Sequence, residues 1–221
     1  YAFYGSGITS VILPDTLINI QRYAFAYSAI EEVVIPASVT FIGGYAFYNT
    51  PVKSVTFGDG SVLGQIEQYA FAYTSQLGSI SLPTTLSELG TYAFYNSAIS
   101  SVSFGEGSLL TYIPAHAFSA TQLLTVELPD SIVYIDDNAF RDCRNLVSVS
   151  LGSGQDLELR SNVFYNTGLT SVTIPANVEY IGEYAFVGLE NLTQFVVSED
   201  NPYYSAVDGV LYNKDGTKLI A

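Results

Sequence analysis

The side chains that most often carry out enzymatic chemistry are scarce in this chain. It has one histidine, His116, one cysteine, Cys143, and no tryptophan. His116 stands directly before an Ala-Phe pair, where most equivalent positions hold tyrosine, which indicates a substituted structural position. Cys143 would need a nearby base and a lowered pKa to act as a nucleophile, so we favour a packed, unreactive thiol. Neither residue has the spacing of a metal site.

The carboxylates also give no strong indication of a catalytic or metal site. Asp136, Asp137 and Asp142 could together hold a hard cation, but they lack the Asp-x-Asp-x-Asp-Gly spacing, so a solvated turn is favoured. A carboxylate pair for glycoside hydrolysis stays open, because its spacing is spatial rather than sequential, although no pattern supports it. The sequence therefore predicts no catalytic residue, no metal site and no cofactor.

Small hydroxyl side chains recur at regular positions between apolar residues. Alternating apolar residues predict short β-strands, whose intervening side chains point outward. The hydroxyls would form a flat face, either a shallow binding surface for protein, glycan or ordered water, or simply a solvated sheet. The candidate ligand surface comprises Ser54, Thr56, Ser79, Ser81, Ser101, Ser103, Thr125, Glu127, Ser148, Ser150, Ser171 and Thr173.

Tyrosines on both sides of the Ala-Phe pairs form a second candidate surface. Half-buried tyrosine anchors interfaces and stacks on sugars, but it also packs well between repeating units, which is the interpretation we favour. The secondary aromatic surface comprises Tyr48, Tyr73, Tyr95 and Tyr165.

A recurring Ala-Phe pair must position all these side chains. Successive phenylalanines are 22, 22, 24, 23, 24, 22, 24 and 22 residues apart, and Val163 replaces the alanine once. A period in the low twenties indicates a solenoid of about nine stacked coils. The phenylalanines are Phe3, Phe25, Phe47, Phe71, Phe94, Phe118, Phe140, Phe164 and Phe186.

Two further apolar signatures complete each 22–24-residue unit. A segment apolar-x-x-apolar-x-apolar ends at Pro or Gly and predicts a short strand. Two apolar residues before the next phenylalanine form a third inward corner, which Asp156 interrupts, so we expect an irregular coil there. Stacked coils would pair their strands in parallel, about 4.8 Å apart.

The strand ends follow an alternating pattern. From the second unit to the eighth, Pro-ended and Gly-ended strands alternate, and the Gly-ended ones carry extra residues, as in Gly58-Asp-Gly-Ser61. Gly-x-Gly after a strand can bind phosphate, but no helix start, lysine or third glycine follows at the required spacing. A bulged turn is therefore favoured.

The repeat stops after Val197. Residues 210–212 and 218–220 are strand-like and flank a turn sequence at 213–216, which predicts a hairpin. We accordingly divide the chain into a solenoid over 1–198, beginning within a repeat, and a capping hairpin or joint to a following module over 199–221. Because no initiator methionine is present, we expect a fragment of a longer protein.

The net charge of −14, from 21 acidic and 7 basic residues, argues against nucleic acid and anionic membrane surfaces as partners. It would suit a basic partner. No run approaches 18 consecutive apolar residues, so membrane insertion is not expected.

The combination Leu-x-x-Val-x-Leu-Pro, Leu-x-x-Ile and Tyr-Ala-Phe-x-Asn, closed by Asn-Pro-x-Tyr and Asp-Gly-Val-Leu-Tyr-x-Lys-Asp-Gly, resembles the BspA-like, Treponema-type leucine-rich repeat family over essentially all 221 residues. The family's usual cysteine after Ala-Phe-x-Asn appears only as Cys143. The resemblance implies a right-handed leucine-rich-repeat coil with a parallel β-sheet, short strands and few or short helices. It also implies an extracellular or cell-surface location and a role in adhesion.

Three functions remain as hypotheses. The leading one is a non-catalytic recognition or adhesion module that binds a protein or glycan on a host or neighbouring cell. The alternative is a structural spacer or assembly subunit that self-associates through its open N-terminal end. A glycosidase-like enzyme stands third.

Overall fold

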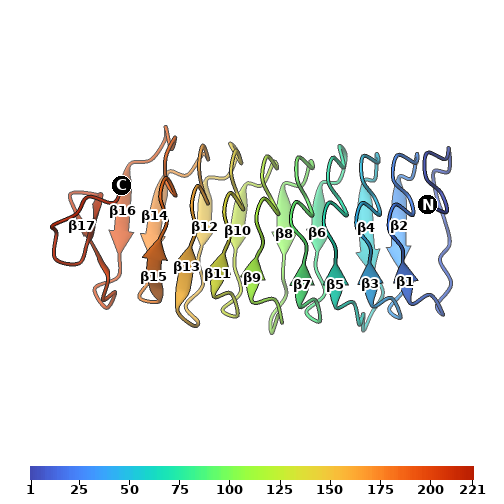
Figure 1. Cartoon of the computed structure of the whole chain (residues 1–221), viewed down its shortest axis with the longest axis horizontal. Helices are drawn as coiled ribbons and strands as arrows, with labels where there is room; N and C mark the ends of the chain where they lie inside the picture. Colours follow the sequence, from blue (N-terminus) through green and yellow to red (C-terminus); the bar gives the residue numbers. More distant parts are fainter.

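The computed structural model describes residues 1–221 and shows an elongated parallel β-solenoid that ends in an antiparallel hairpin (Figure 1). Two rows of eight strands each run along the solenoid, and before the first strand Ser10 forms an isolated bridge with Glu32. The predicted repeat solenoid is confirmed, with about eight complete turns. The structure contains no helix, and hence none that could cross a membrane.

The first row of strands comes from the segments that end at Pro or Gly. In β4, for example, Val55 is buried while Ser54 and Thr56 on either side are exposed, as the alternation predicted. The row consists of β2 (Glu32–Ile35), β4 (Ser54–Phe57), β6 (Ser79–Ser81), β8 (Ser101–Ser103), β10 (Thr125–Glu127), β12 (Ser148–Ser150), β14 (Ser171–Ile174) and β16 (Gln194–Val197).

A second row of strands forms where the sequence indicated only an apolar corner. It gives two four-stranded ladders, β1-β3-β5-β7 and β15-β13-β11-β9. The register between β13 and β15 shifts between Leu157 and Glu158, which confirms the irregular coil expected beside Asp156. The strands are β1 (Asn19–Ile20), β3 (Phe41–Ile42), β5 (Gln65–Ile66), β7 (Glu88–Leu89), β9 (Tyr112–Ile113), β11 (Tyr134–Ile135), β13 (Leu157–Leu159) and β15 (Val178–Ile181).

The first row is divided into two-stranded ladders, β2–β4, β6–β8, β10–β12 and β14–β16. Each of the first three ladders starts at a Pro-ended strand and stops after a Gly-ended one. The loops that follow contain Gly60, Gly105, Gly107 and Gly152 at φ between 71° and 75°, a conformation that glycine adopts without steric cost. These loops are turns. Because they follow every second strand and the ladders stop there, the sheet face repeats every two coils.

The phenylalanine column forms the centre of the core. Neighbouring rings from Phe3 to Phe186 lie 5.1–5.9 Å apart and are nearly parallel. The coils approach closely because the residue before every ring except Phe164 is alanine: Phe47 N donates to Ala70 O of the next coil at 2.8 Å, and Ala70 is fully buried. One cluster of 53 buried residues runs through the whole solenoid.

The terminal segment reverses direction twice, and the sequence predicted the second reversal. The first is an additional hairpin of β17 (Tyr204–Val207) and β18 (Val210–Asn213), whose turn is Asp208-Gly209. The expected strand over 218–220 is reduced to a single bridge between Tyr212 and Leu219. Asp-Gly suits a two-residue turn with positive φ at both positions, here 50° and 80°, which explains the first reversal. The predicted reversal at 213–216 also forms, since Asn213 N donates to Lys218 O at 3.0 Å and Ile220 N donates to Leu211 O at 2.9 Å.

Asn201 fastens this hairpin to the last coil. Its fully buried amide donates to Pro175 O and Val178 O at 2.8 and 3.0 Å, and its Oδ1 accepts from the N–H groups of Tyr203 and Tyr204. Asn201→Ala leaves these buried groups unpaired, so it should lower the free energy of unfolding by about 2–3 kcal/mol in urea titration.

Asn145→Ala serves as the control, because the exposed Asn145 amide makes one side-chain bond, to Gln122. It should change the free energy of unfolding by less than about 0.5 kcal/mol. Equal effects of the two variants would contradict the anchoring role of Asn201.

Candidate functional site

The twelve residues of the candidate ligand surface all lie on the outer face of the first strand row. Eleven are exposed, and Ser171 is half-buried. Parallel pairing places them in register, for example Ser79 beside Ser101 and Ser81 beside Ser103. The result is two rows of short polar side chains that extend across β4 to β14.

Shallow grooves lie where the ladders are interrupted. The larger, of about 740 Å³, lies between β4 and β6; Ser54, Thr56, Ser79 and Ser81 line its floor, and the loop 58–61 forms part of its wall. A smaller groove of about 350 Å³ repeats the arrangement between residues 105–108 and 128–131. Sequence reasoning missed these grooves, although the Pro/Gly alternation was their signal.

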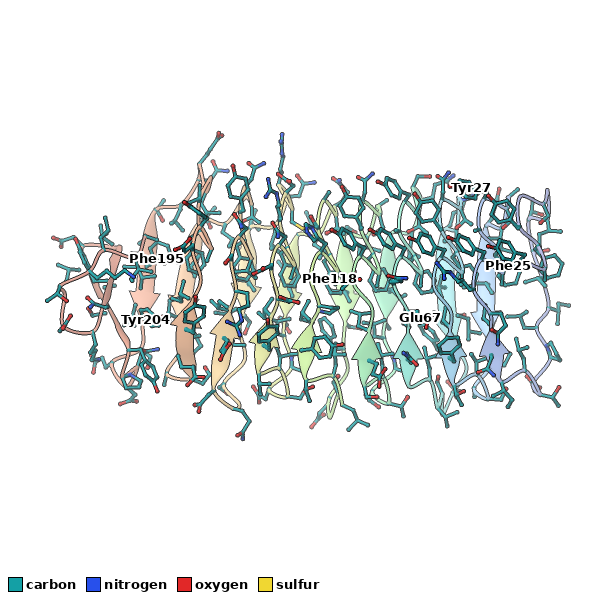
Figure 2. All side chains as sticks on the ribbon, in the orientation of Figure 1. Phe25, Tyr27, Glu67, Phe118, Phe195 and Tyr204 are labelled. Carbon is teal, nitrogen blue, oxygen red and sulfur yellow. The ribbon has the colours of Figure 1, made fainter.

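A tyrosine strip, formed by ten tyrosines of the first five coils, follows one edge of the solenoid. Tyr27 shows its position at the upper edge in Figure 2, above the buried ring of Phe25. The sequence indicated a surface of tyrosines on both sides of Ala-Phe, which includes eight members of this set, and the secondary aromatic surface named from it contained Tyr48, Tyr73 and Tyr95. The strip comprises Tyr1, Tyr4, Tyr23, Tyr27, Tyr45, Tyr48, Tyr69, Tyr73, Tyr92 and Tyr95.

The strip has two rows of different geometry. In the first, rings stack face to face with centroids 4.7–5.0 Å apart from Tyr1 to Tyr92. In the second, from Tyr4 to Tyr95, each ring meets the next edge to face at 5.3–5.5 Å. Tyr165 is not part of the tyrosine strip. Its ring is instead covered by the Arg141 guanidinium, which lies 4.5 Å from the ring centroid.

Five tyrosines before Ala-Phe adopt left-handed backbone conformations. Tyr23, Tyr45, Tyr69, Tyr92 and Tyr184 have φ between 56° and 60°, whereas Asn138 and Asn162 occupy the same coil position elsewhere. The left-handed conformation costs a non-glycine residue about 1–2 kcal/mol, and asparagine tolerates this conformation better. A stacked aromatic pair contributes about 0.5–1.5 kcal/mol of stabilisation, which offsets much of that cost where neighbouring rings stack.

His116 continues the first row of the strip. Its ring stacks on Tyr92 at 4.4 Å, and burial lowers its pKa below the usual value. Cys143 is fully buried with its Sγ 3.2 Å from Thr121 Oγ1, and burial raises the pKa of the thiol to about 11. Both residues thus have the structural environments expected from the repeat.

The three aspartates do not share a site. Asp136 accepts from Tyr134 Oη and the Asp137 N–H, Asp137 accepts from the Ser161 N–H, and Asp142 pairs with Arg141. No group of three or more metal-ligating side chains gathers anywhere in the structure.

Comparisons with known proteins agree with this geometry. A sequence profile described as the BspA type leucine-rich repeat region matches residues 1–110 and 111–207. No curated protein sequence matches significantly.

Several solved structures are similar. The pneumococcal vaccine antigen PcpA is 25% identical with a TM-score of 0.55, and the match covers 90% of this chain and 58% of that one. A leucine-rich cell surface protein of Faecalibacterium prausnitzii is 28% identical (TM-score 0.63; 92% and 49% covered). A leucine-rich repeat protein of Bacteroides ovatus is 25% identical (TM-score 0.66; 86% and 54% covered).

The chain thus spans about half the length of these structures. The profile matches nearly the whole chain, and the solenoid has the coil length and parallel strand pairing that the family resemblance implied. This chain belongs to the BspA-type leucine-rich repeat family.

Proposed function

We propose that the chain is a non-catalytic recognition module, displayed outside the cell or on its surface, that binds a protein or glycan of a host or neighbouring cell. The observation that carries the proposal is the extended face of exposed hydroxyls on β4 to β14, with grooves at the ladder breaks. A repeated, exposed and rigid surface suits recognition of an extended ligand.

The shape of this face favours recognition over catalysis. The grooves are open and lined mainly by hydroxyl side chains, glycine and other non-hydrophobic residues, whereas sites for small molecules are usually concave and lined by apolar side chains. Carboxylates at the edges, such as Asp59, Glu106, Glu127 and Asp130, are exposed. A ligand with basic or uncharged groups would therefore be preferred, and salt should weaken binding of a basic one.

The family supports the surface location. One similar structure is described as a cell surface protein, and another as a vaccine antigen. Those descriptions concern the relatives, and we extend them to this chain as part of the proposal.

The proposal can be tested by screening the folded chain against immobilised matrix proteins, glycan arrays and whole cells. Once a ligand is found, Ser79→Arg should weaken its binding about tenfold or more, because the long side chain fills the groove between β4 and β6. Surface plasmon resonance provides the affinities, and light scattering shows whether the binding species is a monomer.

Thr111→Arg is the matched control, since Thr111 is exposed and lies beside β9 in the second strand row. It should leave the affinity unchanged. Failure of the folded chain to bind any screened surface, or equal losses in both variants, would count against the proposal. A stable polymer that binds nothing would favour the assembly subunit instead.

A further inference from the structure

The tyrosine strip presents ring edges and hydroxyls to the solvent, because the ring faces of its first row are used within the row. Planes of Tyr23, Tyr45, Tyr69 and Tyr92 deviate by only 5–12° between neighbours, with 4.7–4.8 Å between centroids. A sugar ring cannot insert between rings at this distance. The surface available to a ligand is therefore a row of aromatic edges bordered by phenolic hydroxyls.

These hydroxyls are available as hydrogen-bond donors. In the second row, the hydroxyls of Tyr27 and Tyr48 interact with each other, as do those of Tyr73 and Tyr95, and in each pair the accepting hydroxyl keeps its own proton to donate. In the first row, the hydroxyls of Tyr45 and Tyr69 make no such bond. Burial raises the pKa of Tyr45 and of Tyr69, and neighbouring tyrosines raise it further. The hydroxyls of Tyr45 and Tyr69 therefore keep their protons at neutral pH and can donate to carbonyl oxygens.

The strip also has a defined period of two coils. In its second row, Tyr27 and Tyr73 stand two residues after phenylalanine with positive φ, whereas Tyr48 and Tyr95 follow it directly. Two steps of the first row, 4.7 Å and 4.8 Å, advance about 9.5 Å. A polyproline II helix advances about 9.3 Å per turn of three residues, since each residue rises about 3.1 Å.

We propose that the tyrosine strip binds an extended, uncharged, proline-rich segment in the polyproline II conformation. One turn of the ligand would match two coils of the solenoid. Proline rings would pack along the row of aromatic edges; proline-rich segments in this conformation are known to dock in aromatic-lined grooves. The ligand's carbonyl groups, which have no internal partners in this helix, would accept from the tyrosine hydroxyls.

Charge complementarity supports this partner. The strip side chains are uncharged at neutral pH, while the whole chain carries a charge of −14, which would repel an acidic ligand. The Arg22 guanidinium lies over Tyr23 and Tyr45 at 5.1 and 5.5 Å, so this cation is already occupied within the strip. A donor-rich, neutral strip thus complements an acceptor-rich, neutral ligand.

The backbone conformation gives an independent indication. Asn138 and Asn162 show that the coil accepts asparagine at the strained position before Ala-Phe. The first five coils nevertheless all carry tyrosine there. Stacking explains part of this choice, and a ligand that contacts several consecutive rings explains why four of the five strained tyrosines before Ala-Phe are gathered in one uninterrupted row.

The inference rests on the proposed recognition function, and its test uses defined probes. A fluorescent peptide of about twelve prolines is titrated with the full chain and followed by anisotropy. A Gly/Ser peptide of the same length and a β-1,4-linked glucan oligosaccharide serve as comparison probes. We expect saturable binding of the proline peptide alone.

The double variant Tyr45→Asn/Tyr69→Asn should weaken this binding at least tenfold, because asparagine is already accommodated at this coil position. Tyr184→Asn is the matched control: it has the same strained backbone, but Asn138 and Asn162 separate it from the strip, and it should bind as the parent does. Tyr45→Phe/Tyr69→Phe keeps the rings and should weaken binding several-fold through loss of the donors. Circular dichroism verifies the fold of each variant.

Absence of proline-peptide binding, an equal loss in Tyr184→Asn, or saturable binding of the glucan in its place would overturn the inference. Ligand binding that persists in the screen and is lost in Ser79→Arg would show that the recognition function holds although the strip does not bind proline-rich segments. The two proposals can therefore fail separately.

Discussion

Replacing Phe94 with alanine should lower the free energy of unfolding by about 3–5 kcal/mol, as truncation of a fully buried phenylalanine does in packed cores. The Phe94 ring is completely buried and stacks between Phe71 and Phe118 at 5.4 and 5.3 Å. Alanine would leave a cavity in the middle of the column, and the backbone bonds that hold the adjoining coils together limit its collapse. Urea titration monitored by circular dichroism measures the change.

Ser101→Ala is the control for this variant. Ser101 is exposed on β8, so its substitution should change the free energy of unfolding by less than about 0.5 kcal/mol. Because the solenoid is stabilised mainly by contacts between neighbouring coils, Phe94→Ala should also broaden the transition. A fully stable Phe94→Ala variant would mean that the phenylalanine column does not hold the coils together.

Gly90→Ala should destabilise the solenoid by about 2–3 kcal/mol, within the range found for overpacked cores. A Cβ at this position would lie 2.2 Å from the Gln68 N and 2.4 Å from the Glu67 carbonyl carbon. Both atoms belong to the backbone of the preceding coil, so no side chain can rotate away. The coils would have to separate locally, which should appear as a lower midpoint in urea and earlier thermal unfolding.

Gly78 offers a matched glycine-to-alanine control. A Cβ there meets no atom within 4 Å, and its φ is not positive. Gly78→Ala should leave stability unchanged or raise it by up to about 1 kcal/mol, because alanine reduces the freedom of the unfolded chain. If Gly90→Ala were as stable as Gly78→Ala, close backbone contact between coils would not be the reason for glycine at position 90.

The sequence predicted the first strand row well because one local rule governs it. Alternating apolar residues such as Val55 must face the core, which places Ser54 and Thr56 outside, and stacking repeats this in every coil. The second strand row was harder to predict. Its strands are mostly two residues long, as in β5, so they contain too few positions to show alternation.

The first reversal of the terminal segment was missed, whereas the second was predicted. Two turn sequences, Asp208-Gly209 and 213–216, follow each other closely and both form. Contacts with the last coil support the first reversal: Gly209 O accepts from Phe195 N, and Asn201 ties the start of its hairpin to the last coil. Both contacts involve residues from outside the turn itself.

By itself, the sequence determined the period of the solenoid, the residues of its core and the outward direction of the hydroxyl rows, because all three follow from apolar spacing within one coil. Only the tertiary structure decided which surface residues become neighbours. The grooves arise where Gly-ended strands interrupt the ladders, and the tyrosine strip arises because rings about 23 residues apart stack within 5.0 Å. Both depend on how one coil lies on the next, a relation that residues within a single repeat do not specify.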